Sequence, residues 1–134
     1  MCSAYQPYDS EDAPPSRELE ELVRYCEKEN IPLLVWCDSI AHHTAWGSTN
    51  CYGRGEALME FLNSTALEIF NMGSKPTFST SVRPEVTDIT LGSYGLMDSI
   101  TDWEVSLEPS LSGGGGNYLV SFNPVFSERY CNAL

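Results

Sequence analysis

Apolar positions in the N-terminal third of the chain follow a helical period. After the polar, proline-rich stretch SEDAPP, apolar residues recur at i, i+3, i+4 and i+7 and so share one helix face: Leu19, Leu22, Val23 and Cys26. Ser16 is a suitable N-cap, and the acidic residues of the first turn suit the positive end of the helix dipole. The pattern predicts an amphipathic helix that ends near Asn30.

Shorter apolar or alternating runs predict strands. CSAY alternates and breaks at Pro7. IPLLVWC is an unbroken apolar run, which is typical of a strand buried on both faces of an α/β sheet. The polar loop DSIAHHTAWGSTN follows it, and helix signals resume at Gly55. Alternating or β-branched segments between Gly, Ser and Pro predict the remaining strands: ALEIFN, PTFSTS, EVTDITLGS, SITDWEVSLE and NYLVSF.

The order of these elements predicts the fold class. Helices alternate with strands first, and a run of strands follows, which indicates a layered α/β or α+β domain with a mixed sheet. The 134 residues are enough for one domain with a core of its own. A composition of 42% hydrophobic and 19% charged residues is typical of a globular protein.

The charge balance narrows the choice of partners. The chain has 7 Lys and Arg against 19 Asp and Glu, a formal net charge of −12. A domain that holds DNA by its phosphates normally carries a basic face. The balance therefore argues against tight, autonomous binding of nucleic acid, and it fits a divalent-cation site or a soluble surface equally well.

Cysteine usage predicts an intracellular location, nucleus or cytoplasm. The count is odd, with no C-x-x-C pair: Cys2, Cys26, Cys37, Cys51 and Cys131. The N-terminus has no apolar run of the signal-peptide kind. Free thiols in a reducing compartment are therefore expected rather than disulfides or zinc knuckles. No apolar stretch approaches the roughly 20 residues that span a bilayer, so no membrane contact is expected.

Two carboxylates stand at positions that suit catalysis. Asp38 follows the buried run LLVWC, and loops at the C-terminal ends of strands often carry catalytic groups in α/β proteins. Asp88 interrupts the otherwise apolar strand VTDITL, where an unpaired carboxylate is unfavourable unless something compensates it. The structural alternatives are that Asp38 is a turn residue and that Asp88 faces solvent on an edge strand.

Other polar and aromatic residues have weaker signals. The neighbours His42 and His43 are expected to hydrogen-bond rather than bind zinc, because no partner lies at zinc-site spacing. Arg54, in GRGE before a helix, either holds a phosphate at the helix N-terminus or belongs to a simple turn. The tryptophans are expected in the core rather than as platforms for bases: Trp36, Trp46 and Trp103.

Read together, three long segments resemble a known domain: SAYQPYDS, LLVWCDSIAHHTAWGSTNCYGRGEALMEFLNSTALEIFNMGSKPTF and EVTDITLGSYGLMDSITDWEVSLEPSLS. They are similar, in order and spacing, to the C-terminal part of the apurinic-like endonuclease domain of arthropod non-LTR retrotransposons. That domain is a member of the endonuclease/exonuclease/phosphatase superfamily. The resemblance covers residues 2–122 and predicts a truncated domain over residues 1–122, with residues 123–134 an unassigned tail.

The resemblance implies a fold and an activity. The implied fold is an α/β sandwich of two packed mixed sheets flanked by helices. The implied activity is Mg²⁺-dependent hydrolysis of a DNA phosphodiester, which nicks the target and primes reverse transcription. In such a reaction a metal ion and preorganised donors stabilise the charge of a phosphorane-like transition state.

The resemblance also carries over three site residues. Tyr5 matches the family's phosphate-contacting tyrosine. Asp38 matches the Asp of an Asp-x-Asn motif and is expected to orient or deprotonate water. Asp88 matches an Asp that supports the site by hydrogen bonding.

The remaining site positions depart from the family. Ile40 stands where Asp-x-Asn has its Asn, and its side chain neither donates nor accepts a hydrogen bond. The glycines Gly113–Gly116 replace the Asp and His of a closing Ser-Asp-His motif, whose Ser is kept at Ser112. They are no phosphate-binding loop, because no Lys and Ser/Thr follow and no helix begins there. The half of the domain that carries an Asn and the metal-binding Glu lies outside the resemblance.

These matches and departures predict an endonuclease fragment that is inactive as it stands. An alternative is a non-catalytic remnant that serves as a protein-interaction module or homodimer, since the missing half would leave an apolar sheet face uncovered. A third interpretation takes the chain as one piece of a larger element whose polymerase is encoded elsewhere.

Overall fold

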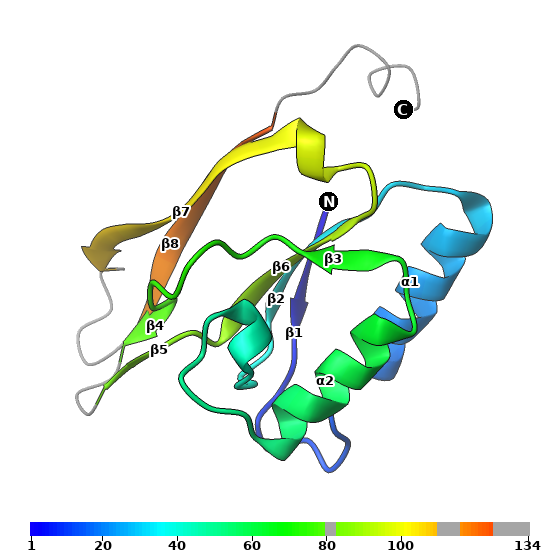
Figure 1. Ribbon diagram of the computed structural model, residues 1–134. Helices are drawn as coiled ribbons and strands as arrows, with labels where there is room; N and C mark the ends of the chain where they lie inside the picture. Colours follow the sequence, from blue (N-terminus) through cyan, green and yellow to red (C-terminus); the bar gives the residue numbers. More distant parts are fainter. Residues whose placement is uncertain (80–82, 110–115, 125–134) are drawn as a thin grey trace.

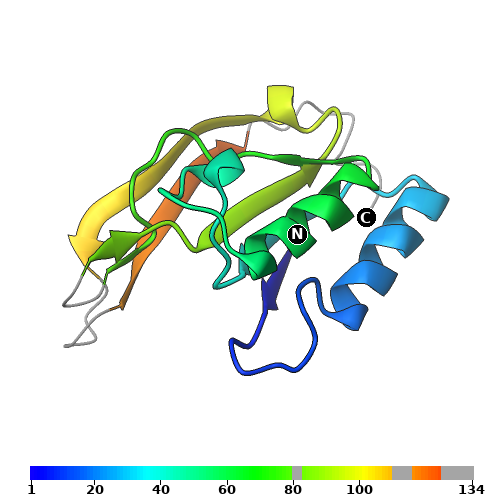
Figure 2. The same ribbon diagram turned by 60° about the horizontal axis from the view of Figure 1, so that its bottom comes forward.

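The computed structural model describes residues 1–79, 83–109 and 116–124, which form two sheets and two α-helices (Figure 1). One four-stranded sheet has the order β1-β2-β6-β3 and the other has the order β5-β4-β8-β7. Both helices lie against one face of the first sheet, and the long strands of the second sheet lie on its other side (Figure 2). The predicted α/β architecture with two layers of sheet is confirmed.

The first sheet is mixed. β1 runs parallel to β2, whereas β2 and β3 both run antiparallel to β6. β6 therefore lies inside the sheet, and β1 and β3 are its edges. Its strands are β1 (Cys2–Tyr5), β2 (Leu34–Asp38), β3 (Leu67–Ile69) and β6 (Asp88–Ser93).

The second sheet is paired antiparallel throughout its described strands. Its strands are β4 (Phe78–Ser79), β5 (Pro84–Glu85), β7 (Ile100–Pro109) and β8 (Gly116–Pro124). Trp103 on β7 is buried and donates from Nε1 to Oγ1 of Thr90 on β6, at 3.0 Å. This bond satisfies the buried indole N–H and links the two sheets.

The helices form where the apolar period predicted them. α1 spans Arg17–Glu29, and Oγ of Ser16 caps it by accepting from the Leu19 N–H at 3.3 Å. Asn30 closes α1 in the left-handed conformation, as helix ends often require. α2 spans Gly53–Asn63, and two short 3₁₀ turns, η1 (Thr44–Trp46) and η2 (Met97–Ser99), lie in the connections. Within the described residues, neither α-helix is long and apolar enough to cross a membrane.

The core fills the space between these helices and the first sheet. Val35 and Cys37 of β2 and Ile89 and Leu91 of β6 point into it and are buried. Burial raises the pKa of the Cys37 thiol to about 12, with the nearby carboxylates adding to the rise, so this cysteine is an apolar core residue and not a reactive one.

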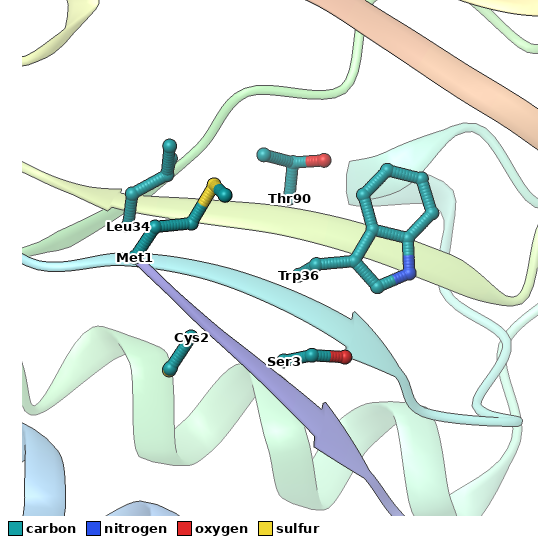
Figure 3. A pocket seen from close by; sticks show the side chains of 6 residues that line it. All are labelled: Met1, Cys2, Ser3, Leu34, Trp36 and Thr90. Atoms are coloured by element: carbon teal, nitrogen blue, oxygen red, sulfur yellow. The ribbon is translucent and has the colours of Figure 1, made fainter.

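The prediction that β2 is buried on both faces is wrong. Burial alternates along the strand, because only Val35 and Cys37 face the helices. Leu34 and Trp36 are half-buried on the opposite face, where they line an open, largely apolar groove of about 330 Å³ (Figure 3). Thr90 and the start of β1, Met1 to Ser3, complete its lining. An apolar run cannot distinguish a covered face from one that lines a groove, and this accounts for the error.

The loop that follows β2 lies against the start of α2. A Cβ atom on Gly55 would come within 1.9 Å of the backbone carbonyl oxygen of His42. Only glycine permits that approach, whereas a Cβ on Gly53 would meet nothing within 4 Å. Gly55 thus sets the position of the loop that carries the histidines.

Candidate functional site

The three predicted site residues meet in one row across the first sheet. Tyr5 of β1 pairs with Asp38 of β2, and Asp38 pairs in turn with Asp88 of β6. β1 and β2 end at this row and β6 begins there, so all three side chains lie at the same end of these strands. Residues far apart in sequence are therefore brought together by strand register.

Exposure falls steadily along the Tyr5–Asp38–Asp88 row. Tyr5 is 61% exposed, Asp38 is half-buried and Asp88 is only 1% exposed. The idea that Asp88 faces solvent on an edge strand is wrong, because β6 lies between β2 and β3. The Tyr5 phenol is therefore exposed to solvent at one end of the row, and the Asp88 carboxyl group is buried at the other end.

Two side chains of the connection between β3 and β4 hold the backbone around Asp88. Oγ1 of Thr77, itself buried, accepts from the backbone N–H groups of both Thr87 and Asp88, each at 3.0 Å. Asn71 hydrogen-bonds to two backbone groups of β6. Its Nδ2 donates to the Asp88 carbonyl at 2.9 Å, and its Oδ1 accepts from the Thr90 N–H at 2.8 Å. Asn71 therefore extends the pairing of β6 beyond the end of β3.

Two buried serines fix the same segment from the other side. Oγ of Ser39 donates to the carbonyl of Thr87, and Oγ of Ser48 donates to the carbonyl of Val86, both at 2.7 Å. The sequence did not single out Thr77, Asn71, Ser39 or Ser48, because polar residues in predicted loops and short strands carry no local pattern that reveals a distant partner. Together these four side chains hold the backbone from Val86 to Thr90 in place.

The Asp88 carboxyl group is buried beside the Asp38 carboxyl group and the Thr77 hydroxyl. Both its oxygens are shielded from solvent, and neither makes a hydrogen bond of good geometry within the described part of the chain. Burial raises the pKa of Asp88 to about 7; the negative charge of Asp38 adds to the rise, and the Thr77 hydroxyl opposes it. A carboxyl group that holds its proton close to neutral pH differs from a surface aspartate and is typical of functional sites.

Ile40 follows the row with an unusual backbone. Its φ angle is +43°, in the left-handed region. A β-branched residue is strained there, whereas Asn and Gly adopt that conformation readily. Ile40 occupies the position where the resemblance predicts Asn, and the backbone there has the shape that Asn prefers.

The histidines and Arg54 take part in hydrogen bonds. Nε2 of His42 lies 3.1 Å from a carboxylate oxygen of Glu85, and Nδ1 of His43 accepts from the Ala45 N–H at 3.0 Å. Arg54 points to backbone carbonyls, with Nη2 donating to Pro7 at 3.0 Å and lying at 3.4–3.5 Å from the carbonyls of Gln6 and Ser39. It clamps the loop after β1 to the loop after β2, and it lies in the first turn of α2 rather than in a simple turn.

Magnesium prefers oxygen ligands, and the Asp38–Asp88 pair offers carboxylates. Within the described residues, however, no group of three or more His, Cys, Asp or Glu side chains comes together. These residues do not fit a complete metal site by themselves. Of the glycines that replace the predicted Asp and His, Gly113 to Gly115 lie outside the described residues, and Gly116 begins β8.

Replacing Asp88 by Asn should change how stability depends on pH. The pKa of Asp88 in the folded chain, about 7, lies above its usual value of 3.8, so the folded state keeps a proton that the unfolded state has lost. The contribution of this group to stability is therefore full below about pH 4 and is lost as pH rises through 7. Asp88→Asn should be more stable than the parent at pH 8, by on the order of 1 kcal/mol or more, with a smaller gap at pH 4.5.

Urea melts followed by tryptophan fluorescence at pH 4.5, 6 and 8 measure this difference. Asp98→Asn is the matched control, because Asp98 is exposed in η2 and should leave the pH dependence unchanged. A parallel pH dependence in Asp88→Asn and the parent would contradict the raised pKa of Asp88.

Replacing Ile40 by Asn should stabilise the chain relative to Ile40→Val. Val keeps the β-branch in the left-handed conformation, while Asn relieves a strain of roughly 1–2 kcal/mol. We expect Ile40→Asn, and likewise Ile40→Gly, to exceed Ile40→Val by about 1 kcal/mol in the free energy of unfolding from urea melts. Equal stability of the three variants would show that the backbone relaxes and that no such strain exists.

Comparisons with known proteins agree with the resemblance noted in the sequence. The sequence model of a family described as endonuclease-reverse transcriptase matches residues 1–113. Among solved structures, the chain is similar to the endonuclease domain of TRAS1, a telomere-specific non-LTR retrotransposon, with 27% sequence identity and a TM-score of 0.72. No curated protein matches the chain.

The structural match covers 92% of this chain and 56% of the TRAS1 endonuclease chain, so the chain spans little more than half the length of that solved structure. The residues matched by the family include all of the Tyr5–Asp38–Asp88 row. The fold, the order of the elements and the family match lead to one conclusion: the chain belongs to the endonuclease-reverse transcriptase family.

Proposed function

We propose that the chain derives from a Mg²⁺-dependent endonuclease that nicks DNA, and that it lacks this activity as it stands. The observation that carries the proposal is the Tyr5–Asp38–Asp88 row, in which strand register aligns a phenol, a half-buried carboxylate and a buried carboxyl group. In this proposal the row is the remaining part of a site that hydrolyses phosphodiesters.

Each residue of the row has a role that its surroundings support. The exposed Tyr5 phenol can donate a hydrogen bond to a phosphate oxygen at the open end of the row. Asp38, half-buried at the end of β2, is placed to orient a water molecule or take its proton. Asp88, whose pKa is raised to about 7, can hydrogen-bond to Asp38 in its protonated form without adding a second negative charge.

Two features support the loss of activity. Ile40 supplies no hydrogen bond where the resemblance predicts an Asn that positions the attacking water. Among the described residues, the two aspartates are also not joined by a third His, Cys, Asp or Glu side chain. Because the members of a catalytic site act together, losing several of them usually leaves little activity. The net charge of −12 further weakens binding to a DNA backbone.

We expect no nicking of supercoiled plasmid by the purified chain with Mg²⁺ or Mn²⁺, above a buffer control. The measurement is conversion of supercoiled to relaxed plasmid on an agarose gel, with Asp38→Ala run in parallel. Relaxed product that forms with the parent chain and disappears with Asp38→Ala would overturn the proposed inactivity while supporting the role of Asp38.

A second candidate function is self-association through the groove beside β1. The half-buried Leu34 and Trp36 line it, and among the described strands β1 is at the edge of its sheet, with no strand paired along one side. A second copy of the chain that covered this groove would bury both side chains (Figure 3).

Sedimentation equilibrium should then show that the parent chain is a dimer. Trp36→Ser should weaken this dimer, and Met97→Ser should not, because Met97 is exposed and lies outside the groove. A monodisperse monomer contradicts this candidate.

A further inference from the structure

A cavity of about 560 Å³ lies next to the Tyr5–Asp38–Asp88 row but uses other residues. Its walls come from the loop after β1, the loop after β2 and the start of α2, and they are largely apolar. The lining residues are Tyr8, Ile40, His42, Tyr52, Gly53 and Arg54. The volume falls within the range of roughly 300–1,000 Å³ that is common for small-molecule sites.

The ring of Tyr52 is held in place although half of the residue is exposed. Nδ2 of Asn50 donates to the Tyr52 hydroxyl at 2.8 Å. The His42 ring packs against the Tyr52 ring in an edge-to-face contact, with centroids 5.3 Å apart and planes at 68°. His42 is itself anchored by Glu85. An exposed aromatic ring with so many fixed contacts is suited to stacking, because little side-chain freedom remains to be lost on binding.

Arg54 adds a positive charge to the wall of this cavity. Its guanidinium carbon lies 5.9 Å from the centre of the Tyr8 ring, within the range of a cation–π contact. Its Nη2 is engaged by the backbone carbonyls of the two loops, so that edge of the guanidinium faces protein. Its Nε is buried and has no hydrogen-bond partner among the described residues. The cation thus adds a positive charge to a cavity whose lining also includes Tyr8 and Tyr52.

We propose that this cavity binds a nucleobase of a nucleic-acid strand, stacked on the Tyr52 ring beside the Tyr5–Asp38–Asp88 row. The inference rests on the proposed origin in a nucleic-acid-cleaving domain, because it supplies that domain with a contact to the substrate outside the reacting phosphate. Stacking on an aromatic ring does not depend on base identity, since every base has a π face. Because the net charge of −12 repels the phosphates of such a strand, the affinity has to come from stacking in this cavity.

The first test is a proton NMR titration of the whole chain with deoxyadenosine 5′-monophosphate. The matched probe is deoxyribose 5-phosphate, which carries the same phosphate and sugar without the base. Ring protons of Tyr52 and the H2 and H8 protons of adenine should shift when the nucleotide is added, and the sugar phosphate should produce no shift at Tyr52. Equal shifts with both probes would place a phosphate at Arg54 instead and overturn the proposal, as would the absence of shifts with either.

The second test compares variants of exposed tyrosines. Tyr52→Leu keeps an apolar side chain but removes the π face, and Tyr52→Phe restores the ring without the bond to Asn50. Base stacking is worth roughly 1–3 kcal/mol, so Tyr52→Leu should weaken nucleotide binding by about fivefold or more, and Tyr52→Phe should recover most of it. Tyr94→Leu is the control, because Tyr94 is 82% exposed and follows the far end of β6. Equal affinity of Tyr52→Leu and Tyr94→Leu would contradict the proposal.

The two proposals fail separately. Nucleotide binding is measured without metal and without cleavage, so an inactive chain still gives a full result. Nicking without a base-dependent shift at Tyr52 would contradict base binding in the cavity and would still support an endonuclease role of the Tyr5–Asp38–Asp88 row. If Tyr52→Leu unfolds, the titration of the parent chain with the two probes decides the question by itself.

Discussion

The antiparallel pairing of β2 with β6 is the constraint on which the rest of the site depends. It joins the two inner strands of the first sheet and sets Asp38 opposite Asp88. The same register directs Val35, Cys37, Ile89 and Leu91 toward the helices, so the core and the candidate site are fixed by one ladder. A slip of either strand by one residue would turn its aspartate toward the core and its apolar side chains away from it. Burial of the apolar face therefore keeps the two carboxyl groups together.

The surroundings of Asp88 hold its backbone firmly and its carboxyl group only weakly. Thr77, Asn71 and Ser39 satisfy the polar backbone groups on both sides of Asp88, while the carboxyl oxygens remain without partners in the described structure. A buried carboxyl group without hydrogen bonds is unfavourable, and Asn in its place would remove the charge. Such a local conflict with stability is most common at functional sites. The strained Ile40 beside it belongs to the same pattern, since its backbone suits another residue.

Local pattern was enough for some elements and not for others. The apolar spacing of Leu19, Val23 and Cys26 predicted α1 because a helix is a local structure. The run LLVWC predicted β2, but not that Leu34 and Trp36 line a groove, since that depends on which elements cover each face. Asp38 and Asp88 were found through their unusual positions and the family resemblance. The sequence did not predict the contacts of the Arg54 guanidinium or those of the Thr77 hydroxyl, because their partners lie in distant segments. A single sequence does not reveal such partners.

The most direct measurement is a carbon-13 NMR titration of the aspartate carboxyl groups in the folded chain. It tests whether Asp38 and Asp88 form one electrostatically linked pair in a buried position. The account predicts that Asp88 titrates near pH 7 and that Asp38→Asn moves its pKa back toward the usual value, because the charge of Asp38 contributes to the rise. Titration of Asp88 near pH 4, unchanged by Asp38→Asn, would contradict the account.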